Sequence, residues 1–300
     1  MGNALDQPQT RDVRTERVAV APGVSLAVRR TSRPEGSLGG SALPFLLVHG
    51  LASNARMWDG VAAVVARHGH DVAAVDLRGH GRSDKPDDGY DFETITDDLR
   101  AVAEGLGFER PIVVGQSWGA NLAIEFGHRF PGRTRGLACV DGGLVELSER
   151  FPEWDECARV LAPPRLAGTP LVEVERYART THPGWPETGI EGSLANFELR
   201  DDGTVAPWLT YERHMSILRG LWEHRPSERL QTLAVPLLLI PAVPAGDAGA
   251  DREATLARAR DLARRVRVRS FVGADHDIHA QHPGALAAVL LDAVGDGFFA

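Results

Sequence analysis

Short apolar runs alternate with helical patterns along the first half of the chain. Each run has a continuous apolar centre, and the segment after it repeats apolar positions every three or four residues. These pairs of a strand and a helix are 44–50 with 53–69, 70–77 with 91–107, and 110–116 with 117–130. Strands that are apolar on both sides and alternate with helices predict a parallel sheet covered on both faces.

The pattern breaks off and later resumes. Between Gly143 and about Leu233 the strand-like runs disappear and short helical patterns take over, which predicts an inserted helical lid. The alternation then returns with strands at 235–242 and 265–274 and helices at 252–265 and 282–294. At the other end, two apolar segments joined at Pro22 and Gly23 predict a hairpin over Arg17–Arg30.

These boundaries divide the chain into an arm, a core and a cap. We expect a polar N-terminal arm at 1–16, an α/β core made of 17–142 and 214–300, and a helical cap at 143–213. With 300 residues and 43% hydrophobic content, the chain can bury a large core.

Charge and cysteine content narrow the classes of partner. The formal net charge of -8 provides no basic face for nucleic acid. The first 17 residues contain no apolar stretch long enough for a signal peptide, and no apolar run approaches the roughly 20 residues of a membrane span. Cys139 and Cys157 are too far apart in sequence for a metal knuckle. We therefore expect a soluble, cytoplasmic protein that binds neither nucleic acid nor membrane, and its oligomeric state stays open.

The segment Gly115-Gln116-Ser117-Trp118-Gly119 lies between a buried strand and a helix, where the motif G-x-S-x-G presents a nucleophile. In such a sharp turn the serine backbone is strained, and the two glycines let strand and helix approach each other. We therefore expect Ser117 at the carboxyl edge of the sheet, where the N-terminus of a helix favours negative charge.

A serine hydroxyl needs a base, and histidine is the most suitable. His276 follows the last predicted strand, which places it at the same edge as Ser117. Its acidic partner is either Asp141, directly after a strand, or Asp247, which lies further along the loop after its strand. Because Asp141 is nearer to the end of its strand, we favour Asp141. Chain order does not decide between them. The histidines near His276 lack the accompanying ligands of a metal site, so we expect neither metal nor cofactor.

The remaining candidates concern the oxyanion and the substrate. The backbone N–H groups of Trp118 and Leu51 are the expected oxyanion donors, and His49 is expected to order the loop that carries Leu51. The Trp118 side chain adjoins the nucleophile and is expected to line the substrate site, and His214 could face it.

Taken together, the segments VHGLASNARMWDG, DLRGHGRSDKP, GQSWGAN, CVDGG and GADHDIHAQHP resemble the landmarks of the α/β-hydrolase superfamily. The resemblance extends over nearly the whole chain from about Arg17. It implies a mostly parallel eight-stranded sheet with helices on both faces and an inserted helical cap. An acid after the sixth strand resembles the arrangement in haloalkane dehalogenase-like and coelenterazine luciferase-like members, which supports Asp141, although those groups have an aspartate in place of Ser117.

That difference indicates the chemistry. Serine attack on an alkyl halide or epoxide would leave an unreactive ether, whereas attack on a carbonyl gives an acyl-serine that water can release. We therefore expect hydrolysis of a carboxylic ester or thioester, or of a lactone, with a small apolar acyl or ring-bearing substrate. The alternatives are a non-hydrolytic or C–C bond-cleaving enzyme of the same fold and a catalytically silent ligand receptor.

Overall fold

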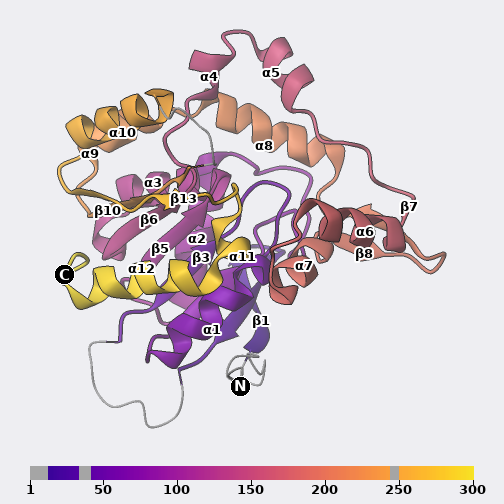
Figure 1. Ribbon diagram of the computed structural model, residues 1–300, viewed down its shortest axis with the longest axis horizontal. Helices are drawn as coiled ribbons and strands as arrows, with labels where there is room; N and C mark the ends of the chain where they lie inside the picture. Colours follow the sequence, from indigo (N-terminus) through magenta and orange to yellow (C-terminus); the bar gives the residue numbers. More distant parts are fainter. Residues whose placement is uncertain (1–12, 34–41, 244–249) are drawn as a thin grey trace.

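Eight strands form one sheet whose central strands are parallel (Figure 1). In order across the sheet they are β1 (Val13–Ala21), β2 (Val24–Thr31), β4 (Val72–Val75), β3 (Phe45–Val48), β5 (Ile112–Gln116), β6 (Gly136–Val140), β10 (Leu237–Ile240) and β12 (Val266–Val268). The pairings of β2 with β1 and with β4 are antiparallel, and the others are parallel. The computed structural model describes residues 13–33, 42–243 and 250–300. This architecture confirms the predicted sheet.

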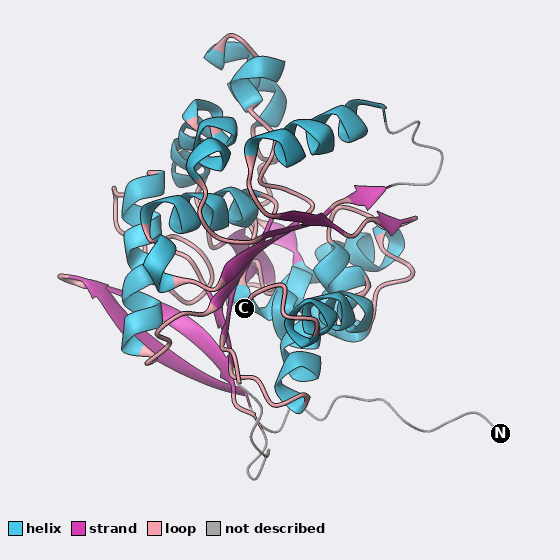
Figure 2. Cartoon of the chain, turned by 90° about the vertical axis from the view of Figure 1, so that its left-hand side faces the viewer, coloured by secondary structure: helices cyan, strands magenta, loops and turns pink. Residues whose placement is uncertain are grey.

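Helices cover both faces of the sheet, as Figure 2 shows from the side. One face carries α2 (Phe92–Gly105), α3 (Trp118–Arg129), α9 (Pro226–Thr232) and α10 (Ala250–Leu262), and the other carries α1 (Asp59–Arg67), α11 (Ile278–Gln281) and α12 (Pro283–Gly295). Alternate strand residues face opposite layers: Leu46 and Val48 pack with the first set, Phe45 and Leu47 with the second. All four are fully buried, which explains the unbroken apolar run at β3.

The predicted hairpin is present and begins earlier than expected. β1 starts at Val13, so residues 13–16 of the expected polar arm belong to the sheet, and residues 1–12 lie outside the described part. The sequence did not predict this part of the strand because Arg14, Thr15 and Glu16 are polar, and a strand at the edge of a sheet tolerates polar side chains. Gly23 supplies the positive φ of 74° that the turn requires.

Several polar side chains begin the helices that the sequence predicted. Asn54 accepts a hydrogen bond from the Arg56 N–H at 2.8 Å and caps the short 3₁₀ helix η1 (Ala55–Trp58), which leads into α1. Asp91 accepts from the Thr94 N–H at 2.8 Å and caps α2. A second short 3₁₀ helix, η2 (Pro131–Arg133), follows α3.

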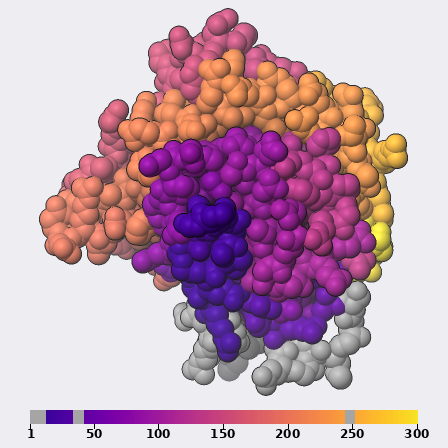
Figure 3. All heavy atoms as spheres, turned by 180° about the vertical axis from the view of Figure 1, so that it is seen from behind, coloured from indigo at the N-terminus to yellow at the C-terminus, as the bar shows by residue number. Residues whose placement is uncertain are grey.

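The chain between β6 and α9 forms the inserted unit. It contains the helices α4 (Leu147–Arg150), α5 (Trp154–Leu161), α6 (Leu171–Thr181), α7 (Glu187–Leu194) and α8 (Tyr211–Glu223). Seen from behind, the insertion, coloured pink to orange, projects from the top and one side of the core (Figure 3). Because α8 runs continuously across residues 213 and 214, the expected boundary between cap and core falls inside a helix.

The expectation that the insertion contains no strands is wrong. The strands β7 (Thr169–Pro170), β9 (Thr204–Pro207) and β8 (Phe197–Leu199) form a small antiparallel sheet within it. Each strand has two to four residues, which is too short to produce a readable alternation of apolar and polar positions.

The segment 265–274, predicted as one strand, divides into two. β12 pairs with β10 in the main sheet, whereas β13 (Phe271–Val272) pairs in parallel with β11 (Ala242–Val243). The backbone N–H of Arg269 still donates to the Leu239 carbonyl at 2.9 Å, so the chain follows the same neighbour across the break. This second short pair carries the chain onward to His276.

Candidate functional site

Ser117 occupies the turn between β5 and α3. Its backbone has φ 53° and ψ -121°, a left-handed conformation that a non-glycine residue rarely adopts. A Cβ placed on Gly119 would lie 2.5 Å from the backbone oxygens of Val48 and His49, and one on Gly115 would overlap the Gly119 carbonyl. Strand, turn and helix can therefore meet only with glycine at both positions.

Neighbouring loops meet at this turn. The Ser117 N–H donates to the Val140 carbonyl at 3.0 Å, directly before Asp141. The Gln116 side-chain amide donates to the His276 carbonyl at 3.3 Å. A Cβ on Gly142 would lie 2.6 Å from the Ser117 Cα, so that loop too packs directly against the serine backbone. The loops that carry Ser117, Asp141 and His276 are thus fastened to one another at one edge of the sheet.

Asp141 and His276 are hydrogen-bonded side chain to side chain. The Asp141 Oδ2 lies 2.6 Å from the His276 Nδ1, and the Asp141 Oδ1 accepts from the Ala242 N–H at 2.9 Å. The bond at Nδ1 leaves Nε2 of a neutral imidazole as the free acceptor. The other acid considered, Asp247, lies outside the described residues.

The electrostatic setting of His276 favours its charged form. The hydrogen bond that His276 donates to Asp141 is the largest influence and raises the pKa of His276 above its ordinary value of 6.5, against the opposing effect of burial. Its side chain keeps 55% of its surface exposed, whereas that of Asp141 keeps 22%. The carboxylate is therefore the better shielded member of the pair, and the ring remains open on its other side.

The segments that carry the two expected oxyanion donors run close to Ser117. A Cβ on Gly50 would lie 3.2 Å from the Ser117 Cβ, so the loop that carries Leu51 runs close to the serine. Within the described ranges, neither the Leu51 N–H nor the Trp118 N–H donates to a protein acceptor. For Trp118 this follows from its place at the start of α3, where backbone N–H groups have no acceptor within the helix.

His49 orders this loop, in agreement with its expected role. Its Nε2 accepts from the Leu77 N–H at 3.0 Å, and its Nδ1 lies 2.7 Å from the Gly50 carbonyl, to which it donates. Burial lowers the pKa of His49, although Asp76 opposes this effect, so the ring is a neutral structural bridge.

The two candidate substrate-binding residues lie in different units of the fold, Trp118 in the core and His214 in the insertion. Trp118 is 2% exposed at the start of α3, and His214 is half-buried on α8 of the insertion. Burial lowers the pKa of His214 to about 4, so this ring is neutral near pH 7. No described hydrogen bond involves the His214 ring, and a positive charge on it would disfavour protonation of His80.

The sequence reading missed His80 and Gln116. His80 is 1% exposed, and its ring stacks on Trp118 with centroids 5.8 Å apart. A histidine in a Gly-rich loop gives no sign in the sequence of such burial. Gln116, inside the motif itself, could have been recognised as a polar residue at the end of an otherwise apolar strand.

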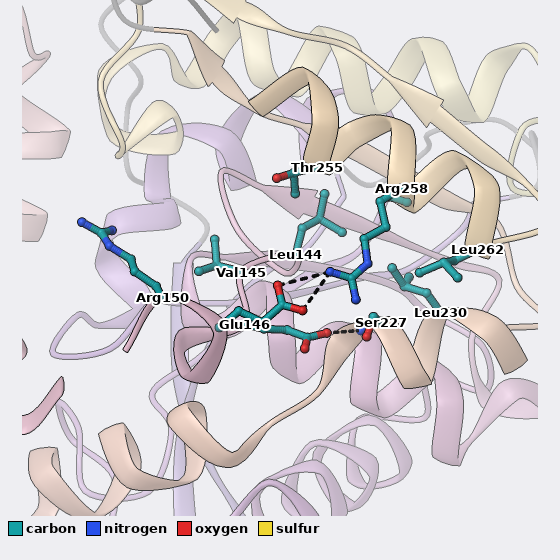
Figure 4. A pocket seen from close by; sticks show the side chains of 11 residues that line it. Leu144, Val145, Glu146, Arg150, Ser227, Leu230, Thr255, Arg258 and Leu262 are labelled. Carbon is teal, nitrogen blue, oxygen red and sulfur yellow. Dashed lines mark hydrogen bonds and ion pairs between the residues drawn. The ribbon is translucent and has the colours of Figure 1, made fainter. Parts of the chain in front are cut away.

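A separate pocket of about 830 Å³ lies between the insertion and the core (Figure 4). Apolar side chains such as Leu144 and Leu230 form part of its wall, and the ion pair of Glu149 with Arg258 crosses it at 3.0 Å. None of the candidate catalytic residues lines this pocket.

Within the described ranges, no group of three side chains that could ligate a metal converges. None of the helices in that part of the chain is long and apolar enough to cross a membrane.

Comparison with known proteins gives a match to a family model and several relatives that align with different shares of the chain. A family model described as the alpha/beta hydrolase fold matches residues 44–169. An uncharacterized protein of Mycobacterium tuberculosis is 33% identical over 135 residues, which make up 45% of this chain and 39% of that protein. The chain therefore spans about two fifths of the length of that relative. A non-heme chloroperoxidase of Streptomyces lividans is 27% identical over 266 residues, 83% of this chain and 90% of that protein.

Solved structures match over a larger share of the chain. An E-2-(acetamidomethylene)succinate hydrolase has a TM-score of 0.74 at 21% identity, covering 94% of this chain and 99% of the other. A thioesterase domain from the curacin biosynthetic pathway has a TM-score of 0.73 at 22% identity, covering 94% and 100%. At these identities the likeness shows a shared fold.

Proposed function

We propose, from the premise that this chain belongs to the α/β-hydrolase superfamily, that it is a serine hydrolase that cleaves a carboxylic ester or thioester. Ser117 would be the nucleophile, His276 the base, and Asp141 the carboxylate that orients the base. The observation that carries the proposal is the strained Ser117 backbone, in a turn bonded to the loop of a histidine that Asp141 holds at 2.6 Å.

The first half of the reaction forms an acyl-enzyme. The His276 Nε2 takes the Ser117 hydroxyl proton as the serine oxygen attacks the substrate carbonyl carbon, and Asp141 stabilises the resulting imidazolium. The Leu51 and Trp118 N–H groups are proposed to bind the negative oxygen of the tetrahedral intermediate, because both lack other acceptors. When the bond to the leaving group breaks, His276 returns the proton to the departing oxygen or sulfur.

Water completes the cycle. His276, neutral again, removes a proton from water, which attacks the acyl-serine carbonyl and forms a second tetrahedral intermediate. Its collapse releases the carboxylic acid while His276 returns the proton to the Ser117 oxygen. A serine ether from an epoxide or alkyl halide would lack this exit, which favours carbonyl substrates.

Some of the related proteins have names that indicate carbonyl chemistry, whereas others are epoxide hydrolases. The structural neighbours include a thioesterase domain and an esterase, Rv0045c of M. tuberculosis, and one curated relative is a 2-(acetamidomethylene)succinate hydrolase of Mesorhizobium japonicum. We further propose that the insertion acts as a cap over a small apolar acyl or ring-bearing substrate. A cytoplasmic location is proposed as well, and the two buried cysteines, both unpaired, agree with it.

A fluorophosphonate probe followed by intact-mass analysis tests the nucleophile. We expect one adduct on the wild-type chain and none on Ser117→Ala. A panel of p-nitrophenyl esters and acyl thioesters of increasing chain length then tests turnover, with Ser117→Ala as the control. Ligand binding without turnover at any chain length would support a receptor instead, and cleavage restricted to C–C bonds would support the other alternative.

A further inference from the structure

We infer that the His80 Nε2 and the Trp118 indole N–H together recognise an uncharged amide in the acyl part of the substrate. The inference rests on the proposed function, because it assigns a specificity to the same site. Two buried polar rings without protein hydrogen-bond partners at these atoms, one of them next to the nucleophile, carry it.

His80 presents an acceptor. Its Nδ1 lies 2.9 Å from the Arg78 carbonyl, which can only accept, so Nδ1 carries the proton and Nε2 carries a lone pair. That Nε2 is buried and has no partner among the described residues. Leaving such a group unsatisfied costs about 1–3 kcal/mol, which a bound donor would recover.

Trp118 presents a donor beside it. The indole Nε1–H is also buried and without an acceptor in the described ranges, and the ring stacks on His80 at an angle of 28°. Indole nitrogen donates and never accepts. The two stacked rings therefore offer opposite hydrogen-bonding polarities, and Trp118 directly follows Ser117 in the chain.

The order of strands indicates which part of the substrate reaches this place. Asp141 and His276 follow β6 and β13, on one side of β5, whereas His80 follows β4 on the other side of it. His276 must deliver its proton to the leaving group, so the leaving group lies on its side. The acyl part then extends toward His80.

The charge state of His80 narrows the chemical class of the substrate group that this site can recognise. Burial keeps His80 neutral by holding its pKa well below 6.5, and the lone pair of a neutral imidazole repels a carboxylate. A donor and an acceptor presented together match the C=O and N–H of an amide. An alkyl chain would leave both protein atoms unsatisfied.

Matched esters test the inference. The p-nitrophenyl esters of N-acetylglycine, N-acetyl-β-alanine and N-acetyl-γ-aminobutyrate are compared with those of pentanoate, hexanoate and heptanoate, which have the same chain lengths. The mono-p-nitrophenyl ester of glutarate supplies a carboxylate in place of the amide. Each kcat/KM is divided by the rate constant for hydroxide hydrolysis. At one length or more we expect the amide ester to exceed its alkyl counterpart about ten-fold, and the carboxylate ester to be the poorest.

Variants test whether His80 and Trp118 cause the preference for the amide ester over the alkyl ester. His80→Phe and Trp118→Phe keep an aromatic ring and remove the acceptor or the donor, so the ratio of amide to alkyl ester should fall about ten-fold in each. His80→Gln restores an acceptor oxygen and should retain more of the ratio than His80→Phe. His279→Phe makes the same change at another buried histidine, packed on Trp58, and should leave the ratio unaltered.

The possible failures are distinguishable. Absence of fluorophosphonate labelling and of turnover on every ester overturns the proposed function. Turnover with equal corrected rates for amide and alkyl esters at all three lengths overturns only the recognition site, as does a ratio that survives both Phe variants. If one variant does not fold, as judged by its thermal unfolding and its labelling, the other decides the question.

Discussion

At the scale of single residues, Asp141 controls the protonation of His276. Its hydrogen bond raises the pKa of His276 above 6.5, and the base must be neutral to accept the serine proton. We expect kcat/KM to rise with pH through a midpoint above 6.5. Asp141→Asn removes the charge that favours the imidazolium, so the midpoint should move to lower pH and activity should fall about a thousand-fold or more.

Asp275→Asn is the matched control for this profile. Asp275 is next to His276 in the chain, but its carboxylate accepts from the Gln281 amide at 3.2 Å and makes no bond to the ring. Its midpoint should stay close to that of the wild type. A wild-type midpoint at or below 6.5, or an unchanged midpoint in Asp141→Asn, would contradict the assigned role of Asp141.

The glycines of the turn permit a second test at this scale. Gly119→Ala forces a methyl group against the backbone oxygens of Val48 and His49, which belong to a buried strand and loop and cannot move aside cheaply. We expect the free energy of unfolding in urea to fall by about 2 kcal/mol or more. Gly132→Ala, where a Cβ meets no atom within 4 Å, should change it by less than about 0.5 kcal/mol. Equal effects would contradict the close approach.

At the scale of elements, a buried ion pair joins the loop after β4 to α2. The Arg78 guanidinium makes two hydrogen bonds to Asp98, at 2.6 and 2.8 Å, and both side chains are almost fully buried. Arg78→Met leaves the Asp98 carboxyl without its partner. We expect a loss of about 3 kcal/mol or more in urea unfolding, because a lone buried charge is costly.

The control pair connects the insertion to α10 at the surface. Glu149 and Arg258 also make two contacts, at 3.0 and 3.2 Å, but both side chains are more than half exposed. Arg258→Met should therefore cost less than about 1 kcal/mol. If both variants lost the same stability, burial would not be the deciding factor.

At the scale of the whole molecule, the sequence predicted those features that repeat along the chain. Apolar runs of four or five residues marked the central strands, and the glycines around Ser117 marked the turn. The sequence favoured Asp141 as the acidic partner of His276 but did not exclude Asp247. Which of the two loops reaches His276 depends on how strands that are distant in the sequence pair with one another. The two-residue strand at Thr169–Pro170 and the unpartnered Nε2 of His80 also arise only from tertiary contacts.

The insertion returns to the core at a buried carboxylate. Glu125 on α3 accepts from Arg229 on α9 at 2.8 Å and lies 3.2 Å from the Nε2 of His224, which directly follows α8. Burial opposes ionisation of Glu125, but the hydrogen bonds to His224 and Arg229 outweigh it and lower its pKa from 4.5 to about 2. The carboxylate on α3 therefore contacts both α9 and the residue that follows α8. These contacts hold the C-terminal end of the insertion against the core.

A carboxyl whose pKa is lowered by folding stabilises the protein above the unfolded-state pKa and loses that contribution as the pH falls toward the folded-state pKa. Glu125→Gln keeps the size of the side chain, so it should be less stable than the wild type by about 3 kcal/mol at pH 7. The difference should shrink as the pH falls from 4.5 toward 2. Urea unfolding at pH 7, 5.5, 4 and 3 measures it, with Glu104→Gln, at a surface ion pair with Arg100, as a control expected to lose less than about 1 kcal/mol. A difference between Glu125→Gln and the wild type that stayed constant down to pH 3 would show that the carboxylate charge does not hold the insertion to the core.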